Sequence, residues 1–207
     1  MSSSTCWHCS VANPESLFCQ NCSALQAPSP DYYRFFGFDK RLDLDIGALQ
    51  KRFYELSKTL HPDRFTRRTE QEKQFSLEAT AILNDGFRVL RDPVLRAEYI
   101  LKEEGFEVGE SRKSDVSEEL LEEVFELNLA LEDLKSGDSS ARAQLEEAQA
   151  KFMRMREQID ADLLQLFHHW DANGQRETLG DIRKVLSKRR YITNLLAETG
   201  KTLAASA

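Results

Sequence analysis

The sequence predicts an all-α fold with a small cysteine-rich knob at the N-terminus and an antiparallel three-helix bundle at the C-terminus. Beyond about residue 45, apolar side chains recur at spacings of three and four residues, which is the period of amphipathic helices. Glycine and proline interrupt this period at a few positions, which therefore mark turns. All four cysteines precede these helices, in two C-x-x-C pairs.

With 207 residues, of which 41% are hydrophobic and 30% charged, the chain is long enough to bury a core in one or two domains. It contains no run of about 18 apolar residues, and its first residues lack both an apolar signal core and an Arg-rich presequence. We therefore expect a cytoplasmic protein without a membrane partner; a mature mitochondrial matrix protein shown without its presequence would look the same. The net charge of −7 argues against nucleic-acid binding as the main task.

The cysteine pairs predict a metal site. Two C-x-x-C pairs form two thiolate knuckles that can converge on one tetrahedral ion, and zinc is the expected metal. The four ligands would be Cys6, Cys9, Cys19 and Cys22. Disulfides, and iron in a rubredoxin-like site, are the alternatives. Four thiolates leave no position for an activated water, so the module is expected to be a docking knob or the contact of a homodimer.

Residues 24–30, which include Pro28 and Pro30, follow no hydrophobic period and predict a short stiff linker. The cysteine module is therefore expected to be separable from the rest of the chain. Removal of its metal would then disorder about the first thirty residues and leave the helices after them intact.

A short aromatic helix is expected over about residues 31–37. Asp31 is a suitable N-cap and Gly37 a suitable terminator, and Asp43 or Asp45 can cap the helix that follows. Gly86 lies on the apolar face of a later helix, where glycine costs helix propensity, so we expect another helix to approach closely there.

Two longer amphipathic segments are expected to form a hairpin. The apolar face of the first comprises Ile46, Leu49, Phe53, Leu56 and Leu60, and that of the second comprises Phe75, Ala79, Ile82, Leu83, Gly86 and Leu90. Proline cannot continue a helix, so the first segment must stop before Pro62. The segments then pack antiparallel, with His61, Pro62 and Asp63 at an exposed tip.

Six basic residues lie beside this tip in an acidic chain, namely Lys51, Arg52, Lys58, Arg64, Arg67 and Arg68. Such a local inversion of charge favours an acidic partner surface. Between about residues 31 and 99 the order of elements resembles the J domain of DnaJ-type co-chaperones. The resemblance implies that His61, Pro62 and Asp63 stimulate ATP hydrolysis by a heat-shock chaperone ATPase. The residues expected to steer that encounter are Lys51, Arg52, Lys58 and Arg64.

A narrower resemblance lies at residues 83–106. The segment Leu83-Asn84-Asp85-Gly86-Phe87-Arg88-Val89-Leu90, followed by Pro93, Arg96, Ala97, Tyr99, Leu101, Gly105 and Phe106, is similar to HscB, the J-domain co-chaperone of iron-sulfur cluster assembly. Gly86 stands where that family more usually has alanine. The resemblance implies a helical C-terminal domain, an iron-sulfur scaffold protein as client and a dedicated chaperone ATPase as partner.

The hydrophobic period breaks at residues 105–114, where a domain junction is expected. Three helices follow, at about residues 115–135, 139–170 and 177–197. Gly137 and Asn173-Gly174 supply the turns of a three-helix bundle. The predicted domains are the cysteine module at 1–27, the J domain with its connecting helix at 28–108 and the bundle at 109–207.

The first helix of the bundle carries two apolar stripes. The expected core face comprises Leu120, Val124, Leu127, Leu131 and Leu134. Leu121, Phe125 and Leu129 form a second stripe centred roughly 140° from the first, so one neighbouring helix cannot cover both. Cover by the third helix is the alternative to exposure, and Tyr191 on that helix is expected to be exposed as well. The resemblance to HscB implies a scaffold-binding surface made of Leu121, Phe125, Glu126 and Tyr191. At the neighbouring positions 122 and 129, Glu122 and Leu129 differ from the apolar and acidic residues that some members of that family have.

We find no nucleophile elbow, phosphate-cradling loop or His–carboxylate pair in the sequence, which argues against an enzyme. The leading hypothesis is a co-chaperone that binds an iron-sulfur scaffold protein, delivers it to a chaperone ATPase and stimulates that ATPase. The alternative is a zinc-dependent adaptor, in which the cysteine module is the binding site and the hairpin is passive. A metalloenzyme is a third hypothesis, and it requires an exchangeable ligand position on the metal.

Overall fold

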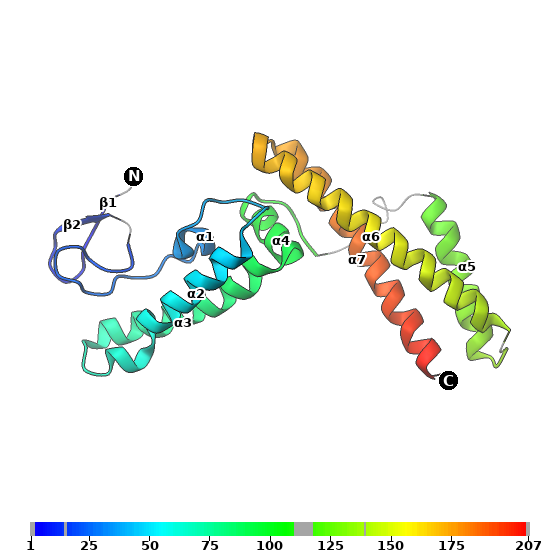
Figure 1. Ribbon diagram of the computed structural model, residues 1–207, viewed down its shortest axis with the longest axis horizontal. Coiled ribbons are helices and arrows are strands. Elements are labelled where there is room, and N and C mark those ends of the chain that lie inside the picture. The colour runs from blue at the N-terminus through cyan, green and yellow to red at the C-terminus, as the bar shows by residue number, and fades with distance from the viewer. Residues whose placement is uncertain (1–2, 15, 110–117, 139, 206–207) are drawn as a thin grey trace. The chain divides into compact units, whose positions relative to one another are not determined.

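A computed structural model describes residues 3–14, 16–109, 118–138 and 140–205. Helices account for most of these residues, which confirms the predicted all-α class. The chain divides into two compact units, Met1–Arg96 and Ala97–Ala207 (Figure 1). The three predicted domains are a finer division and stay a prediction. None of the described helices combines the length and the apolar character that crossing a membrane requires.

The N-terminal segment contains two short strands that the sequence did not predict. β1 (Ser3–Thr5) pairs antiparallel with β2 (Ala12–Pro14), and an isolated bridge joins Phe18 to Leu25. Strands of three residues are too short to show an alternating pattern, which explains why they were missed.

The aromatic helix α1 (Tyr32–Phe36) has the predicted caps. The Asp31 carboxylate accepts a hydrogen bond from the Arg34 N–H at 3.1 Å, and Gly37 ends the helix in the left-handed conformation. For helix α2 (Ile46–Leu60), the N-cap is Asp45 rather than Asp43, because the Asp45 carboxylate accepts from the Ala48 N–H at 2.9 Å.

Helices α2 and α3 (Glu70–Arg91) form the predicted antiparallel hairpin (Figure 1). The 3₁₀ helix η1 (Pro62–Phe65) lies between them. Leu49, Leu56, Leu60, Ala79, Leu83, Gly86 and Leu90 of the predicted apolar faces are buried, and Phe53, Phe75 and Ile82 are half-buried. Ile46, in the first turn of α2, is 41% exposed. The rings of Phe53 and Phe87 stack across the hairpin, with 4.3 Å between their centroids.

Gly86 allows helix α1 to approach α3 closely, as predicted. A Cβ atom at this position would lie 3.0 Å from the rings of both Tyr32 and Phe36. These distances are too short for an unstrained contact, so the two aromatic rings occupy the space that an alanine side chain would need.

Helix α4 (Pro93–Glu103) follows α3, with proline as its first residue. The Asp92 carboxylate accepts from the N–H groups of Val94 and Leu95, at 2.8 and 2.9 Å. The guanidinium of Arg96 is buried and donates to the backbone carbonyls of Leu42 and Leu90, which fixes the loop before α2 against the end of α3.

In the C-terminal unit, the three long helices are α5 (Glu118–Lys135), α6 (Ala141–Asn173) and α7 (Arg176–Ala205). The predicted starts of the first two, at Asp115 and Ser139, lie outside the described residues. Gly137 and Gly174 adopt positive φ angles of 100° and 63° at the two predicted turns.

Helix α7 extends to Ala205, beyond the predicted end near residue 197. The extension was missed because Thr199, Gly200 and Thr202 are poor helix formers. Thr199 and Thr202 are nevertheless buried, and their hydroxyl groups donate to the backbone carbonyls of Leu195 and Glu198. Tertiary packing therefore overrides the weak local propensity here.

Candidate functional site

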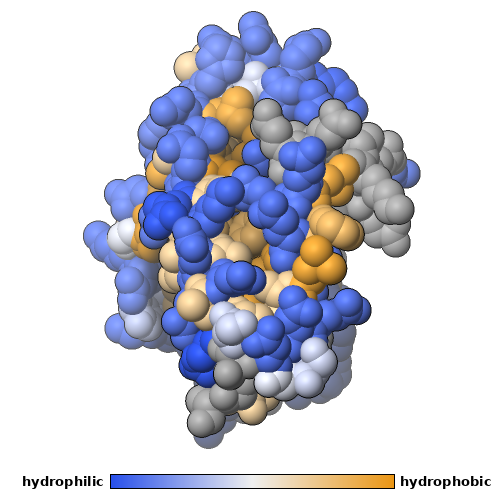
Figure 2. Space-filling view, turned by 90° about the vertical axis from the view of Figure 1, so that its right-hand side faces the viewer, coloured by the Kyte–Doolittle hydropathy of each residue, from blue (hydrophilic) through white to orange (hydrophobic). Residues whose placement is uncertain are grey.

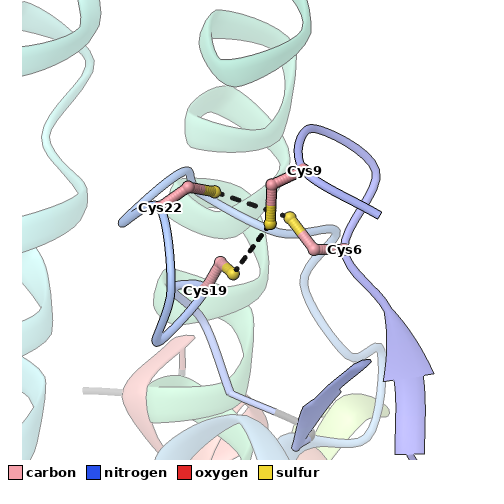
Figure 3. Close-up of side chains that lie close together, drawn as sticks. All are labelled: Cys6, Cys9, Cys19 and Cys22. Carbon is pink, nitrogen blue, oxygen red and sulfur yellow. Dashed lines mark hydrogen bonds between the residues drawn. The ribbon is translucent and has the colours of Figure 1, made fainter. Parts of the chain in front are cut away.

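The four cysteines converge on one point (Figure 3). All four sulfur atoms lie within 4.8 Å of one another, with 3.7 Å between Cys6 and Cys22 and 3.8 Å between Cys9 and Cys19. Four sulfurs bound at about 2.3 Å to one tetrahedral ion are about 3.8 Å apart, whereas a disulfide requires about 2.05 Å. The geometry therefore fits a four-thiolate metal site and disagrees with the disulfide alternative.

Two equivalent knuckles hold the ligands in place. In the first, the Ser10 N–H donates to the Cys6 carbonyl at 3.0 Å, and in the second the Ser23 N–H donates to the Cys19 carbonyl at 2.9 Å. Ser10 and Ser23 both have a φ of 58°, a left-handed conformation that is uncommon outside glycine. Each knuckle thus turns its two sulfurs toward the same point.

Polar hydrogens surround the thiolates. The side-chain amide of Gln26 donates to the sulfur of Cys6 at 3.4 Å, as does the His8 N–H, and the side-chain amide of Asn21 donates to the sulfur of Cys9 at 3.5 Å. Such hydrogen bonds stabilise negative charge on the sulfurs and orient them. Neither amide could be predicted from the sequence, since an isolated Asn or Gln near a C-x-x-C pair carries no distinctive signal.

The thiols differ in acidity. Burial raises the pKa of Cys6, but the backbone N–H groups of Cys9 and His8 outweigh it, so that its pKa falls to about 6. The backbone N–H of Ala24 favours the thiolate of Cys22, yet burial and the neighbouring thiols raise the pKa of Cys22 to about 12. A metal ion must therefore displace the Cys22 proton when it binds, so its affinity falls as the pH falls.

The His61-Pro62-Asp63 tip is exposed at the end of the hairpin, as predicted. The Nδ1 atom of His61 accepts from the Asp63 N–H at 3.3 Å and lies 3.5 Å from the Asp63 carboxylate. The buried ring of Phe65 anchors the turn, so that polar groups are presented on a rigid support.

The predicted basic residues divide into two kinds. Lys51, Lys58 and Arg64 are exposed. Arg52 instead donates to the Phe36 carbonyl at 3.2 Å and to the Glu55 carboxylate at 3.4 Å. Arg52 therefore ties α2 to α1, and part of its charge is neutralised within the chain.

The two apolar stripes of α5 separate as predicted. Leu120, Val124, Leu127, Leu131 and Leu134 are buried, whereas Leu121, Phe125 and Leu129 are 48%, 64% and 47% exposed. The described part of α7 thus leaves the second stripe uncovered. Figure 2 shows apolar side chains gathered at the surface on the side of the molecule that includes α5. Glu126 is exposed as well, but Tyr191 on α7 is only half-buried rather than exposed, contrary to the expectation.

The cysteine module also contacts the hairpin, although no pattern in the sequence predicts these contacts. The Leu25 N–H donates to the Glu72 carboxylate on α3 at 3.4 Å, and the rings of Trp7 and Phe75 meet edge-on at 6.2 Å. Leu25 is fully buried. These contacts contradict the expectation that residues 24–30 separate the module from the helices.

Comparisons with known proteins agree with these features. The chain is 29% identical over 196 residues to the iron-sulfur cluster co-chaperone protein HscB of Mus musculus, covering 92% of this chain and 79% of that protein. It is 33% identical over 155 residues to the co-chaperone protein HscB homolog of Shewanella baltica (strain OS223), covering 75% and 88%. A scan against models of known families finds no match.

Two solved structures have the same fold. The crystal structure of human co-chaperone protein HscB matches with a TM-score of 0.74 and 25% identity, over 96% of this chain and 98% of that one. The chaperone HscB from Vibrio cholerae matches with a TM-score of 0.60 and 25% identity, over 86% and 99%. The fold and the exposed tip thus define a J-domain co-chaperone with an N-terminal four-cysteine module. Within that class, the chain belongs to the HscB family.

Proposed function

We propose that this chain binds an iron-sulfur cluster scaffold protein, delivers it to a heat-shock chaperone ATPase and stimulates ATP hydrolysis by that ATPase. The observation that carries the proposal is the exposed His61-Pro62-Asp63 tip on a rigid hairpin, in a chain whose other unit exposes the apolar stripe of α5. Relatives named as iron-sulfur cluster co-chaperones support it. The chain itself supplies contacts and charge, and the hydrolytic chemistry belongs to the ATPase.

The simplest test measures two activities separately. ATP hydrolysis by the cognate chaperone is followed with and without this chain, and scaffold binding is followed by titration. The proposal predicts faster hydrolysis and saturable binding. The adaptor alternative draws support from Trp7 and Val11 of the cysteine module, which are 39% and 44% exposed. Scaffold binding without any acceleration of hydrolysis would favour the adaptor.

Lys58→Glu is expected to slow association with the chaperone about tenfold at low ionic strength, because exposed charges steer encounter more than they hold a complex. Lys58 lies in the last turn of α2, next to the tip. Stopped-flow association rates at several salt concentrations measure the effect, which should shrink as salt rises. Lys102→Glu reverses an exposed charge on α4 and serves as the control. A change confined to dissociation, and insensitive to salt, would mean that Lys58 packs against the partner.

We propose zinc as the metal and one ion per chain, held by Cys6, Cys9, Cys19 and Cys22. A site that all four sulfurs close has no exchangeable position, so its role is structural. Iron is the competing metal for the same ligands. Elemental analysis of purified protein distinguishes the two, and a tetrahedral four-sulfur spectrum after cobalt substitution would exclude the metalloenzyme hypothesis.

Gln26→Leu is expected to weaken zinc binding by about tenfold, because the Cys6 thiolate loses the amide that donates to it. Competition with a chromophoric chelator at constant pH measures the affinity. Gln20→Leu is the matched control, since Gln20 lies exposed between Cys19 and Cys22. Equal affinities for the two variants would show that the Gln26 amide contributes nothing to the site.

A further inference from the structure

Glu72 is a buried carboxylate that joins two parts of the N-terminal unit. It is 6% exposed. One carboxylate oxygen accepts from the Leu25 N–H of the cysteine module at 3.4 Å. The other accepts from the N–H and the hydroxyl of Thr69, at 3.4 and 3.2 Å, which completes the capping box of α3. Because a buried charge is costly unless it is hydrogen-bonded, both sets of donors stabilise Glu72 where it lies.

The groups that meet α3 are also close to the metal ligands in sequence. Trp7 lies between Cys6 and Cys9, and its ring contacts Phe75 on α3. The indole N–H of Trp7 donates to the Leu25 carbonyl at 2.7 Å. Gln26, the residue after Leu25, donates to the Cys6 sulfur. The geometry of the thiolate cluster therefore fixes the same two residues, Trp7 and Leu25, that hold the module on α3.

The first two turns of α3 are in turn connected to the tip. Thr69 is both the N-cap of α3 and the end of the segment that begins at His61. The buried hydroxyl of Ser76 donates to the Leu60 carbonyl at 2.7 Å, directly before His61. If these turns fray, the segment between Leu60 and Thr69 loses the attachments at both of its ends.

We propose that Glu72 is a positioning residue that couples metal occupancy of the cysteine module to the order of the His61-Pro62-Asp63 tip. With the metal bound, the knuckles hold Leu25 and Trp7 against α3, and the start of α3 is ordered. When the metal is lost, the left-handed turns at Ser10 and Ser23 lose the ligand bonds that keep them in place. The Leu25–Glu72 contact then opens, and the first turns of α3 and the tip become mobile.

The direct test is amide hydrogen exchange of residues 60–76 in the full chain, with zinc bound and after its removal by a chelator. The coupling predicts that metal removal speeds exchange in the wild type about tenfold, the order expected for coupled sites. In Glu72→Ala the same amides should exchange fast in both forms, so that the dependence on metal disappears. Glu72→Gln has one acceptor oxygen, so when that oxygen completes the capping box with Thr69, no acceptor is left for the Leu25 N–H. In this variant α3 should stay capped, and its amides should lose the dependence on metal.

A merely structural role for Glu72 gives a different pattern. Loss of the cap alone would speed exchange by an equal factor with and without zinc. Glu72→Ala would then still respond to metal removal as the wild type does. Leu77→Ala, on the exposed face of α3, is the control and should behave as the wild type. Unchanged protection of residues 60–76 in the zinc-free wild type would overturn the coupling, as would a full metal response in Glu72→Ala.

The functional consequence rests on the proposed stimulation of a chaperone ATPase. Zinc-free wild type should need about tenfold more protein for half-maximal stimulation than the zinc-bound form, while Glu72→Ala should need the same amount in both forms. Equal potency of the zinc-bound and zinc-free wild type would contradict the coupling. Hydrogen exchange needs no partner, so it decides the coupling separately from the proposed function.

Discussion

Replacing His61 by Gln is expected to return ATP hydrolysis by the chaperone to its unstimulated rate. His61 holds the tip turn by accepting from the Asp63 N–H, and its side chain is 56% exposed, available to a partner. Because the side chain is exposed, the change in the free energy of unfolding should stay within about 0.5 kcal/mol. Single-turnover hydrolysis and thermal unfolding measure the two quantities on the same preparation.

Glu70→Gln is the matched control for this variant. Glu70 is exposed at the start of α3, close to the tip in sequence. Within the part of the chain that the structure describes, its carboxylate forms an ion pair with Lys73. It should retain full stimulation. Substantial stimulation by His61→Gln, at saturating concentration and with an intact fold, would show that the tip is not the stimulating element.

The double variant Leu121→Ala with Phe125→Ala is expected to lose at least about 100-fold in scaffold affinity. Truncation of a central interface residue commonly costs about 2 kcal/mol or more, and both side chains are exposed in the free chain, Leu121 by 48% and Phe125 by 64%. Stimulation of the ATPase without scaffold should stay unchanged, since the His61-Pro62-Asp63 tip belongs to the other unit. Calorimetric titration with the scaffold protein measures the affinity.

The stability of the double variant separates a binding surface from a core. Truncating two exposed residues should lower the free energy of unfolding by less than about 1 kcal/mol in total. Truncating two core residues would lower it by about 5 kcal/mol or more. Met153→Ala with Leu164→Ala removes two comparably exposed apolar side chains from α6 and should bind the scaffold normally. Early melting of the first variant, or normal binding by it, would contradict the assignment to α5.

The hairpin and the cysteine cluster could be predicted because their signals are local. Pro62 ends a helix by its own covalent geometry, and two C-x-x-C pairs in one short segment suit one ion, as the sulfur distances confirm. Gly86 was informative for the same reason, since a glycine on an apolar helix face requires a close neighbour, and the rings of Tyr32 and Phe36 fill that place. The two stripes of α5 followed from helix geometry alone.

Contacts between segments far apart in the sequence could not be predicted. In the sequence, Glu72 is only a polar residue near a helix start, and nothing local indicates that Leu25 donates to its carboxylate. The sequence places Arg52 among the steering charges, because it does not show that the Arg52 guanidinium reaches the Phe36 carbonyl. Tyr191 was expected to be exposed from the helical wheel of α7, but packing within the bundle half-buries it.

Single-turnover ATP hydrolysis by the cognate chaperone, with this chain and the iron-sulfur scaffold protein both present, tests the central claim most directly. We expect the scaffold and the chain together to accelerate hydrolysis more than the sum of their separate effects. We also expect this gain to disappear with His61→Gln, which removes the stimulating side chain, and with the Leu121→Ala, Phe125→Ala variant, which does not bind the scaffold. Hydrolysis that stays at the unstimulated rate with the wild-type chain, with or without scaffold, would contradict the account.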